Sequence, residues 1–191
     1  MALLSVANRK KYMKALGYEY TKEGIRKLQK KYFTRSKDID GKYGKNTDIL
    51  LRHCYNVHKY APHFKPQEFR CGCDGKYCTG YPTYMRKEML VLLEAIRVHY
   101  GKPITVTCGL RCKKYNKALN GSVNNSKHLK GKAVDFYQRG TTDTLANRKE
   151  SIKWIKKQPH FGYAYGNGIN SYGNKIGAPY MGNALHVDVE V

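Results

Sequence analysis

The sequence predicts an α+β protein in which a small N-terminal module of three helices precedes a domain built on an antiparallel sheet flanked by helices. Three observations predict this class. Apolar residues recur at helical spacing up to residue 60, and short C-terminal segments alternate apolar and polar residues. Between these regions, two prolines in residues 61–66 indicate a linker. We therefore expect two domains, residues 1–60 and residues 61–191.

The first domain is expected to hold three helices within residues 5–60. The first ends at Gly17, Thr21 can cap the second, and Asn46 or Thr47 can cap the third. Apolar residues recur along each inward face: Val6, Met13 and Leu16, then Ile25, Leu28 and Tyr32, then Ile49, Leu50, Cys54 and Val57.

The second domain combines helices with short strands. An amphipathic helix is expected over residues 83–100, ending at Gly101, and a second over residues 142–157. Alternation predicts strands at residues 104–108, 132–137 and 184–191. Because strands and helices are mixed without a regular βαβ order, we expect short antiparallel strands.

Charge is the extreme feature of the composition. The 191 residues include 36 Lys+Arg and 14 Asp+Glu, which gives a net charge of +22. Such a field concentrates a protein on polyanions, and nucleic acid, anionic membrane and anionic cell-wall polymer all qualify. No apolar run approaches the roughly 18 residues that span a bilayer. The first residues lack the basic-then-apolar order of a secretory signal, so synthesis in the cytoplasm is expected.

Two short segments carry metal-ligand residue types. In residues 132–137, Asp135 points away from its apolar neighbours, and in residues 184–191 His186, Asp188 and Glu190 share one face. Side by side, such strands would gather His128, Asp135 and His186 in one pocket. Two imidazoles and a carboxylate suit catalytic zinc, with the fourth position left for water. Gly131 permits a sharp bend between the first two of these residues.

Spacing across these segments resembles a known family. The pattern S-x-H-x-x-G-x-A-x-D over residues 126–135, the later H-x-D at residues 186–188 and the earlier stretch ITVTCGLRC with Tyr115 and Asn116 resemble the zinc D-alanyl-D-alanine carboxypeptidase and murein endopeptidase family. That family includes many phage endolysins and shares a fold with hedgehog signalling domains. The resemblance covers residues 64–191 and implies a zinc metallopeptidase with His128, Asp135 and His186 as ligands.

Three further residues receive roles. The resemblance implies that Arg111 holds substrate oxygens, and a guanidinium fork suits that task. The family's acidic position before the last ligand is Asn183 here, which cannot act as a base. Asp188 is therefore the candidate, either to accept the proton of the zinc-bound water or to orient a ligand. Ser126 is expected to support the site by hydrogen bonding.

Residues 8–60 resemble a second family, the three-helix peptidoglycan-binding domain. The resemblance lies in Leu28 and Gln29 followed by DGKYGKNT at residues 40–47, and it departs from the family in its very basic helices. It implies wall binding through Asp40, Gly41, Tyr43 and Gly44. Tethering beside a wall peptidase raises the local substrate concentration. A bare helical bundle is the alternative.

Six cysteines complete the candidate residues. Cys71, Cys73 and Cys78 are close in sequence, and Cys108 and Cys112 lie beside the expected substrate strand. In a reducing cytosol they are expected to be thiols or metal ligands rather than disulfides. Packed or solvated thiols are the preferred interpretation, and a structural zinc held by three of one group and one of the other is the alternative.

These features together predict a monomeric phage endolysin that cleaves stem peptides of peptidoglycan and binds anionic wall polymers. It is expected to be made in the host cytoplasm and to act on the wall after release, without a membrane span or a nucleic-acid partner. Two alternatives stay open. One is a non-catalytic wall-binding or virion structural protein of the same fold, and the other is a nucleic-acid-binding protein, which the charge and 17 tyrosines would suit.

Overall fold

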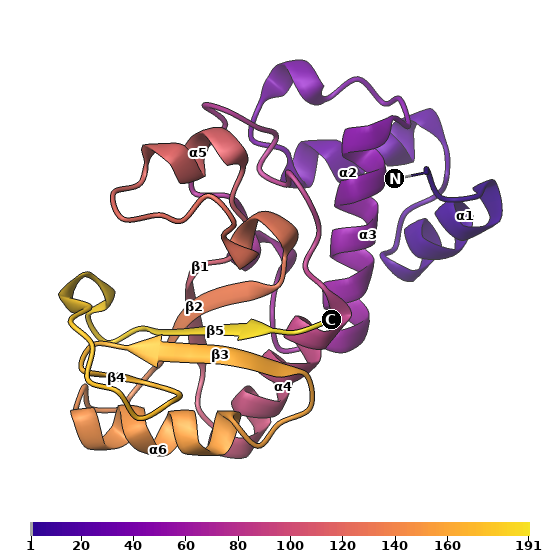
Figure 1. The fold of residues 1–191 in the computed structure, drawn as a ribbon. Helices are drawn as coiled ribbons and strands as arrows, with labels where there is room; N and C mark the ends of the chain where they lie inside the picture. Colours follow the sequence, from indigo (N-terminus) through magenta and orange to yellow (C-terminus); the bar gives the residue numbers. More distant parts are fainter. Residues whose placement is uncertain (1) are drawn as a thin grey trace.

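The computed structural model describes residues 2–191. Six α-helices and a five-stranded antiparallel sheet form in this range, which confirms the predicted α+β class (Figure 1). The first three helices lie together at the N-terminal end, and the sheet belongs to the C-terminal part. None of the helices in residues 2–191 combines the length and apolar character needed to cross a bilayer.

Local capping explains how the N-terminal helices begin. The Thr21 hydroxyl accepts a hydrogen bond from the Gly24 amide, as expected for a cap. The third helix begins one residue after Gly44, so the predicted cap at Asn46 or Thr47 is wrong. Thr47 is buried inside the first turn instead, where its hydroxyl accepts a hydrogen bond from Gln29. The helices are α1 (Val6–Ala15), α2 (Lys22–Tyr32) and α3 (Lys45–Tyr60).

The connection after α3 is packed rather than free. Ala61 and Phe64 are buried and belong to the same hydrophobic core as α3 and the sheet. The short helix η2 (Pro66–Phe69) follows, and Phe69 is fully buried. The core is therefore continuous across the proline-containing segment, and a domain boundary at residue 60 stays a prediction.

The sheet places the two predicted ligand strands next to each other. Its order is β1-β2-β5-β3-β4, and β2 pairs antiparallel with β5 so that Asp135 faces His186 across the ladder. The strands β3 and β4 were not expected from the sequence. The strands are β1 (Ile104–Cys108), β2 (Ala133–Gln138), β3 (Phe161–Gly166), β4 (Ile169–Asn170) and β5 (Leu185–Val189).

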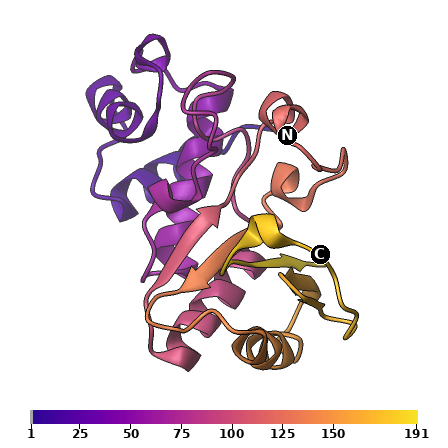
Figure 2. The same cartoon turned by 90° about the vertical axis from the view of Figure 1, so that its left-hand side faces the viewer.

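Helices cover one face of the sheet. Val134, Phe136, Val187 and Val189 are buried in one core with apolar residues of α4 (Lys87–Tyr100) and α6 (Leu145–Ile155). The short helices α5 (Lys113–Ala118) and η3 (Lys127–Lys130) lie on the other side of the sheet from α4 and α6 (Figures 1 and 2). The polar face of β2 and β5 thus lies toward η3 and the loop before α5.

Helix α4 begins at Lys87 rather than at the predicted residue 83. Its cap, Arg86, is extended, and the Arg86 amide donates a hydrogen bond to the carbonyl of Gly131. A Cβ on Gly131 would lie 2.1 Å from the Tyr84 carbonyl oxygen, so the two backbones are in direct contact. The turn that follows η3 therefore holds Arg86 extended, and the helix begins after it.

Candidate metal centre

Three elements position the predicted ligands. His128 lies in η3, Asp135 in the middle of β2 and His186 opposite it on β5. Gly131, at the end of η3, has a φ of 66°, a conformation that glycine adopts without strain. This turn reverses the chain between the first two ligands and brings the His128 ring over β2.

The three side chains converge. Nδ1 of His186 lies 2.7 Å from Oδ1 of Asp135, and Nε2 of His128 lies 3.4 Å from the same oxygen. The two imidazole ring centroids are 5.2 Å apart. The structure thus gathers two imidazole nitrogens around one carboxylate oxygen, which is a ligand arrangement suited to zinc.

An orphaned nitrogen tests whether these residues fit a metal. His128 is 2% exposed, and its Nδ1 donates a hydrogen bond to the Gly109 carbonyl oxygen at 2.7 Å. Its Nε2 is buried and has no hydrogen-bond partner among the described residues. A buried nitrogen without a partner is costly, and the bond at Nδ1 directs its lone pair toward Asp135 and His186. The residues present therefore fit a metal ion.

Electrostatics favours charge in this group. Burial lowers the pKa of His128, but Asp135 and Cys108 beside it outweigh that effect and raise the pKa to about 9. Burial likewise opposes ionisation of Asp135, yet the two histidines beside it hold its pKa far below the usual range. Asp135 is therefore an anion at neutral pH, as a metal ligand must be.

Arg111 and Cys108 adjoin the ligand set. Arg111 Nη2 lies 3.2 Å from Asp135 Oδ2, and Arg111 Nε donates to Cys108 Sγ at 3.0 Å. Cys108 also forms a metal-capable group with His128 and Asp135, with ligand atoms within 4.8 Å of one another. The sequence had indicated Arg111 as a substrate contact but had given Cys108 no role in the centre.

Asp188 lies on the far edge of the His186 ring. Its Oδ2 is 3.5 Å from His186 Nε2, whereas the other ring nitrogen faces Asp135. Asp188 is 6% exposed, and a Cβ on Gly162 would lie 2.4 Å from its Oδ1. The missing side chain at position 162 leaves the room that this carboxylate occupies.

An open cavity of about 710 Å³ adjoins the centre, within the range of ligand-binding sites. Asp135 is the only carboxylate among the residues, within the range 2–191, that line it. Its lining also includes Tyr165, which was not among the predicted site residues because strand β3 was not expected. The Tyr165 ring lies 4.8 Å from that of His186, and burial together with Tyr180 raises the pKa of its hydroxyl.

Ser126 and Asn183 are near the centre in different ways. Ser126 is buried at the start of η3, but its hydroxyl does not cap this helix. Its carbonyl oxygen accepts a hydrogen bond from the Leu129 amide. Asn183 lines the cavity, so the position that the resemblance assigns to an acid carries an amide here.

The predicted wall-binding residues lie far along the chain from this centre, in the turn before α3. Asp40 accepts hydrogen bonds from Gln29 Nε2 and the Lys42 amide, and the Tyr43 hydroxyl donates to Asp48. Gly41 has a φ of 73°, and Gly44 is the N-terminal cap of α3. All four residues thus build the turn itself, and Asp40 and Gly44 are exposed on it.

An α+β fold with a metal-capable histidine and carboxylate group beside a cavity defines a class, the metal-dependent hydrolases. Residues 62–167, more than half of the chain, match the family model described as Peptidase M15. The chain belongs to this family of zinc metallopeptidases. The matched range contains Arg111, His128 and Asp135 and ends before His186. No curated protein and no solved structure matches the chain.

Proposed function

We propose that this metallopeptidase is a peptidoglycan peptidase of the endolysin type whose zinc is held by His128, Asp135 and His186. One observation carries the proposal. Two imidazoles approach the same Asp135 oxygen beside an open cavity, in a chain of the Peptidase M15 family. Neither feature alone defines the reaction, but together they supply a metal site with access for substrate.

The proposed ligands would hold an ion that activates water for hydrolysis. His128 Nε2, Asp135 and His186 Nδ1 would hold the ion, which lowers the pKa of a bound water and polarises the scissile carbonyl. The Gly109 carbonyl fixes the tautomer of His128, and Arg111 fixes the second oxygen of Asp135. These contacts hold the ligands in place before substrate arrives, because a ligand whose other atoms are hydrogen-bonded keeps its orientation toward the ion.

Residues that line the cavity would bind the substrate. Arg111 retains its charge because Cys108 and Asp135 raise its pKa against the effect of burial. Tyr165 stays protonated at neutral pH and can donate a hydrogen bond. A guanidinium and a phenol at one cavity suit the carboxylate and carbonyl oxygens of a stem peptide.

Asp188 serves better as a positioning residue than as the general base. It approaches His186 at Nε2, on the edge of the ring opposite to Asp135. With an ion on Nδ1, the proton of the neutral ring lies on Nε2, where Asp188 can accept its hydrogen bond. The geometry therefore supports the second of the two roles that the sequence left open.

Charge and the N-terminal helices support the cell wall as the location of the substrate. The net charge of +22 draws the protein to anionic polymers such as those of Gram-positive walls. The exposed turn at Asp40 and Gly44 is the proposed contact with peptidoglycan. Synthesis in the host cytoplasm, release to the wall and action as a monomer complete the proposal.

Digestion of purified peptidoglycan with mass spectrometry of the released fragments tests the reaction. The zinc-loaded protein should give new fragments, and their masses identify the bond: free D-alanine for D-Ala–D-Ala, stem peptides for L-Ala–D-Glu, or stems separated from one another for a cross-link. His128→Ala should lose activity by a factor of at least about 1,000, since the ion is the source of the nucleophile. Release that persists after chelation, or in His128→Ala, would contradict the proposal.

A non-catalytic wall-binding or virion structural protein is the second candidate. The cavity favours it in one respect, because Asp135 is the only carboxylate among the lining residues within the range 2–191. Asp135 is committed to the ligand set, so no separate base is evident there. This candidate predicts that the protein sediments with walls, zinc-loaded or not, and that no peptide fragment appears.

A further inference from the structure

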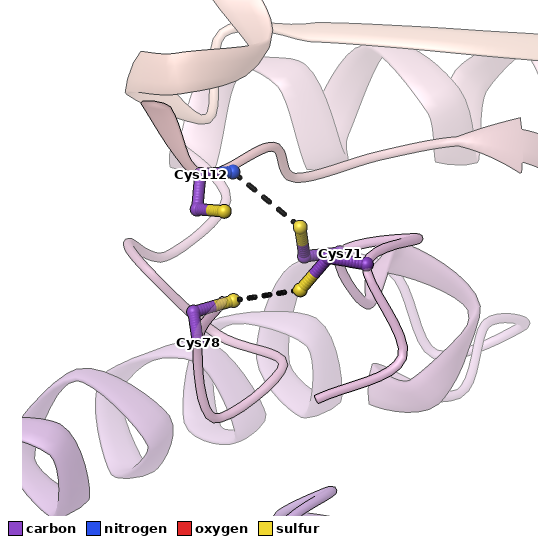
Figure 3. A group of neighbouring side chains, drawn as sticks. Cys71, Cys78 and Cys112 are labelled. Carbon is purple, nitrogen blue, oxygen red and sulfur yellow. Dashed lines mark hydrogen bonds between the residues drawn. The ribbon is translucent and has the colours of Figure 1, made fainter. Parts of the chain in front are cut away.

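A second group of metal-ligand side chains lies apart from the catalytic cavity. It joins Cys71, Cys73 and Cys78, from the segment between η2 and α4, with Cys112, the N-terminal cap of α5. Their sulfur atoms all lie within 4.8 Å of one another, and none forms a disulfide. Three of the four side chains are buried. Figure 3 shows Cys71, Cys78 and Cys112 directed into a common space from different parts of the chain.

The spacing of the sulfur atoms suits a tetrahedral ion. Four thiolates at the usual zinc–sulfur distance of about 2.3 Å lie about 3.8 Å from one another. The Sγ atoms of Cys73 and Cys78 are 3.5 Å apart, and every other pair lies within 4.8 Å. Pairs that are farther apart than about 3.8 Å therefore need to close by at most about 1 Å to reach the spacing of a tetrahedral zinc site.

Backbone amides already point at two of the sulfur atoms. The Cys112 amide donates to Cys71 Sγ, and the Tyr115 amide donates to Cys112 Sγ, both at 3.4 Å. Sulfur accepts such bonds best as a thiolate, because charge strengthens a hydrogen bond. Amide donors to metal-bound sulfur orient the ligand and disperse its charge.

The surrounding chain needs a restraint and supplies positive charge. Residues 70–86 form neither helix nor strand, yet Cys71 and Tyr81 are almost completely buried. A packed segment of this length without secondary structure is unusual. Four thiolates on one divalent ion carry two negative charges. The pKa of Arg35 is raised by its hydrogen bond to Asp38 and also by Cys78 and Cys73, so its guanidinium lies near the cluster.

We propose that Cys71, Cys73, Cys78 and Cys112 bind a structural zinc ion with a closed shell of four sulfur atoms. Zinc is the common ion for such a set, and a shell without an open position serves structure rather than catalysis. Cys112 directly follows Arg111, so the ion anchors the loop that presents Arg111 to Asp135. The ion would also connect this loop to the end of α2, because Thr79, next to Cys78, accepts a hydrogen bond from the Thr34 amide.

The metal content of the full chain, purified under reducing conditions, tests this site. The protein should hold two zinc ions per chain. The double variant His128→Ala/Cys108→Ser should keep one ion, and cobalt in its place should give intense thiolate-to-cobalt absorption in the near ultraviolet. Cys71→Ser and Cys112→Ser should each lose one ion. Cys54→Ala is the matched control, since Cys54 is buried in the main core away from the cluster, and it should keep both.

Two results would overturn the proposal. One is a single ion per chain in the wild type together with no thiolate-to-cobalt absorption in the double variant. The other is that, without reductant, the intact mass of the protein is lower than that of the reduced chain by two hydrogens per disulfide, and that the four cysteines of the cluster resist alkylation. If the cysteine variants fail to fold, the double variant alone decides the question. Loss of peptidase activity with the four-sulfur ion retained would count against the proposed function and not against this site.

Discussion

His186 presents its two ring nitrogens to two different carboxylates. Nδ1 faces Asp135 across the β2–β5 ladder, and Nε2 faces Asp188 two residues along its own strand. Alternation along residues 184–191 predicted that His186 and Asp188 share a face, but it could not indicate which edge of the ring Asp188 approaches. That detail depends on rotamers and on the space left by Gly162, which no local pattern encodes.

Asp188→Asn should weaken zinc binding about 10- to 100-fold, because the ring of His186 loses the charge that orients it. Glu190→Gln is the matched control, since Glu190 directly follows β5 and its exposed carboxylate pairs with Lys127, and it should leave zinc affinity unchanged. Competition with a chromogenic chelator measures both. An unchanged zinc affinity in Asp188→Asn combined with a large loss of kcat would instead assign Asp188 as the general base.

Zinc affinity should rise with pH through about pH 9. The pKa of His128 is raised to about 9 without metal, so a proton competes with the ion below that value, costing up to about tenfold in affinity per pH unit. The stability of the metal-free protein should change in the opposite direction and fall as the pH rises. Protonated His128 stabilises the fold below its ordinary pKa of about 6.5, and this contribution is lost as the pH rises through 9.

Chelator competition and thermal unfolding between pH 6 and 9 check both trends. Zinc affinity that stays flat over this range would contradict the assignment of His128 as a ligand. Cys108→Ser provides the matched comparison, because Cys108 also raises the pKa of His128 and is not one of the three proposed ligands. In that variant the pH at which affinity levels off should fall.

At the scale of elements, the turn between η3 and β2 determines whether the ligands meet. Gly131 there combines a positive φ with direct contact between its backbone and the Tyr84 carbonyl. The sequence predicted a sharp bend at this glycine, and the bend is present. The contact with Tyr84 was not predictable, because it joins residues 47 positions apart in sequence through tertiary packing.

Gly131→Ala should destabilise the protein by about 2–3 kcal/mol, since strain at positive φ adds to a clash with rigid backbone. Gly140→Ala is the matched control. Gly140 has a φ of 70° but nothing within 4 Å of the added carbon, so only about 1 kcal/mol is expected. Urea unfolding of both variants measures the difference. Equal losses would show that the Tyr84 contact has no role in fixing the turn.

Elements with a strong repeating pattern were predictable, and the others were not. Val134, Asp135 and Phe136 alternate cleanly, and β2 was expected for that reason. Strand β3 reads FGYAYG, where two glycines interrupt the alternation and a register shift follows Phe161. Helix α5 has six residues, mostly polar, which is too short for a helical period to appear. The sequence offered a zinc held by cysteines of both groups only as an alternative to packed thiols, because whether Cys112 lies beside Cys71, Cys73 and Cys78 depends on tertiary structure.

At the scale of the whole molecule, positive charge and a continuous core decide how the protein meets its substrate. The N-terminal helices and the sheet share one hydrophobic core, so the proposed wall contact at the Asp40 turn would be joined to the cavity beside Asp135 through packed side chains. Binding to walls should therefore orient the cavity as well as concentrate the protein. The net charge of +22 supplies a long-range attraction that does not depend on that turn.

Wall binding should fall steeply with salt. Raising salt from about 0.1 M to about 1 M shortens the Debye length from about 10 Å to about 3 Å, which screens attraction between exposed charges. Sedimentation of His128→Ala with intact walls and with walls stripped of anionic polymers measures this effect without digestion. Stripped walls should show weaker and less salt-dependent binding. Binding that is identical on both walls would contradict a role for anionic wall polymers.

The most direct test of the catalytic centre is a crystal of the zinc-loaded protein with anomalous diffraction measured at the zinc edge. We expect a peak about 2.0–2.2 Å from His128 Nε2, Asp135 and His186 Nδ1, with one position open toward the cavity. An ion absent from these three atoms, or closed off by Cys108 as a fourth protein ligand, would contradict it.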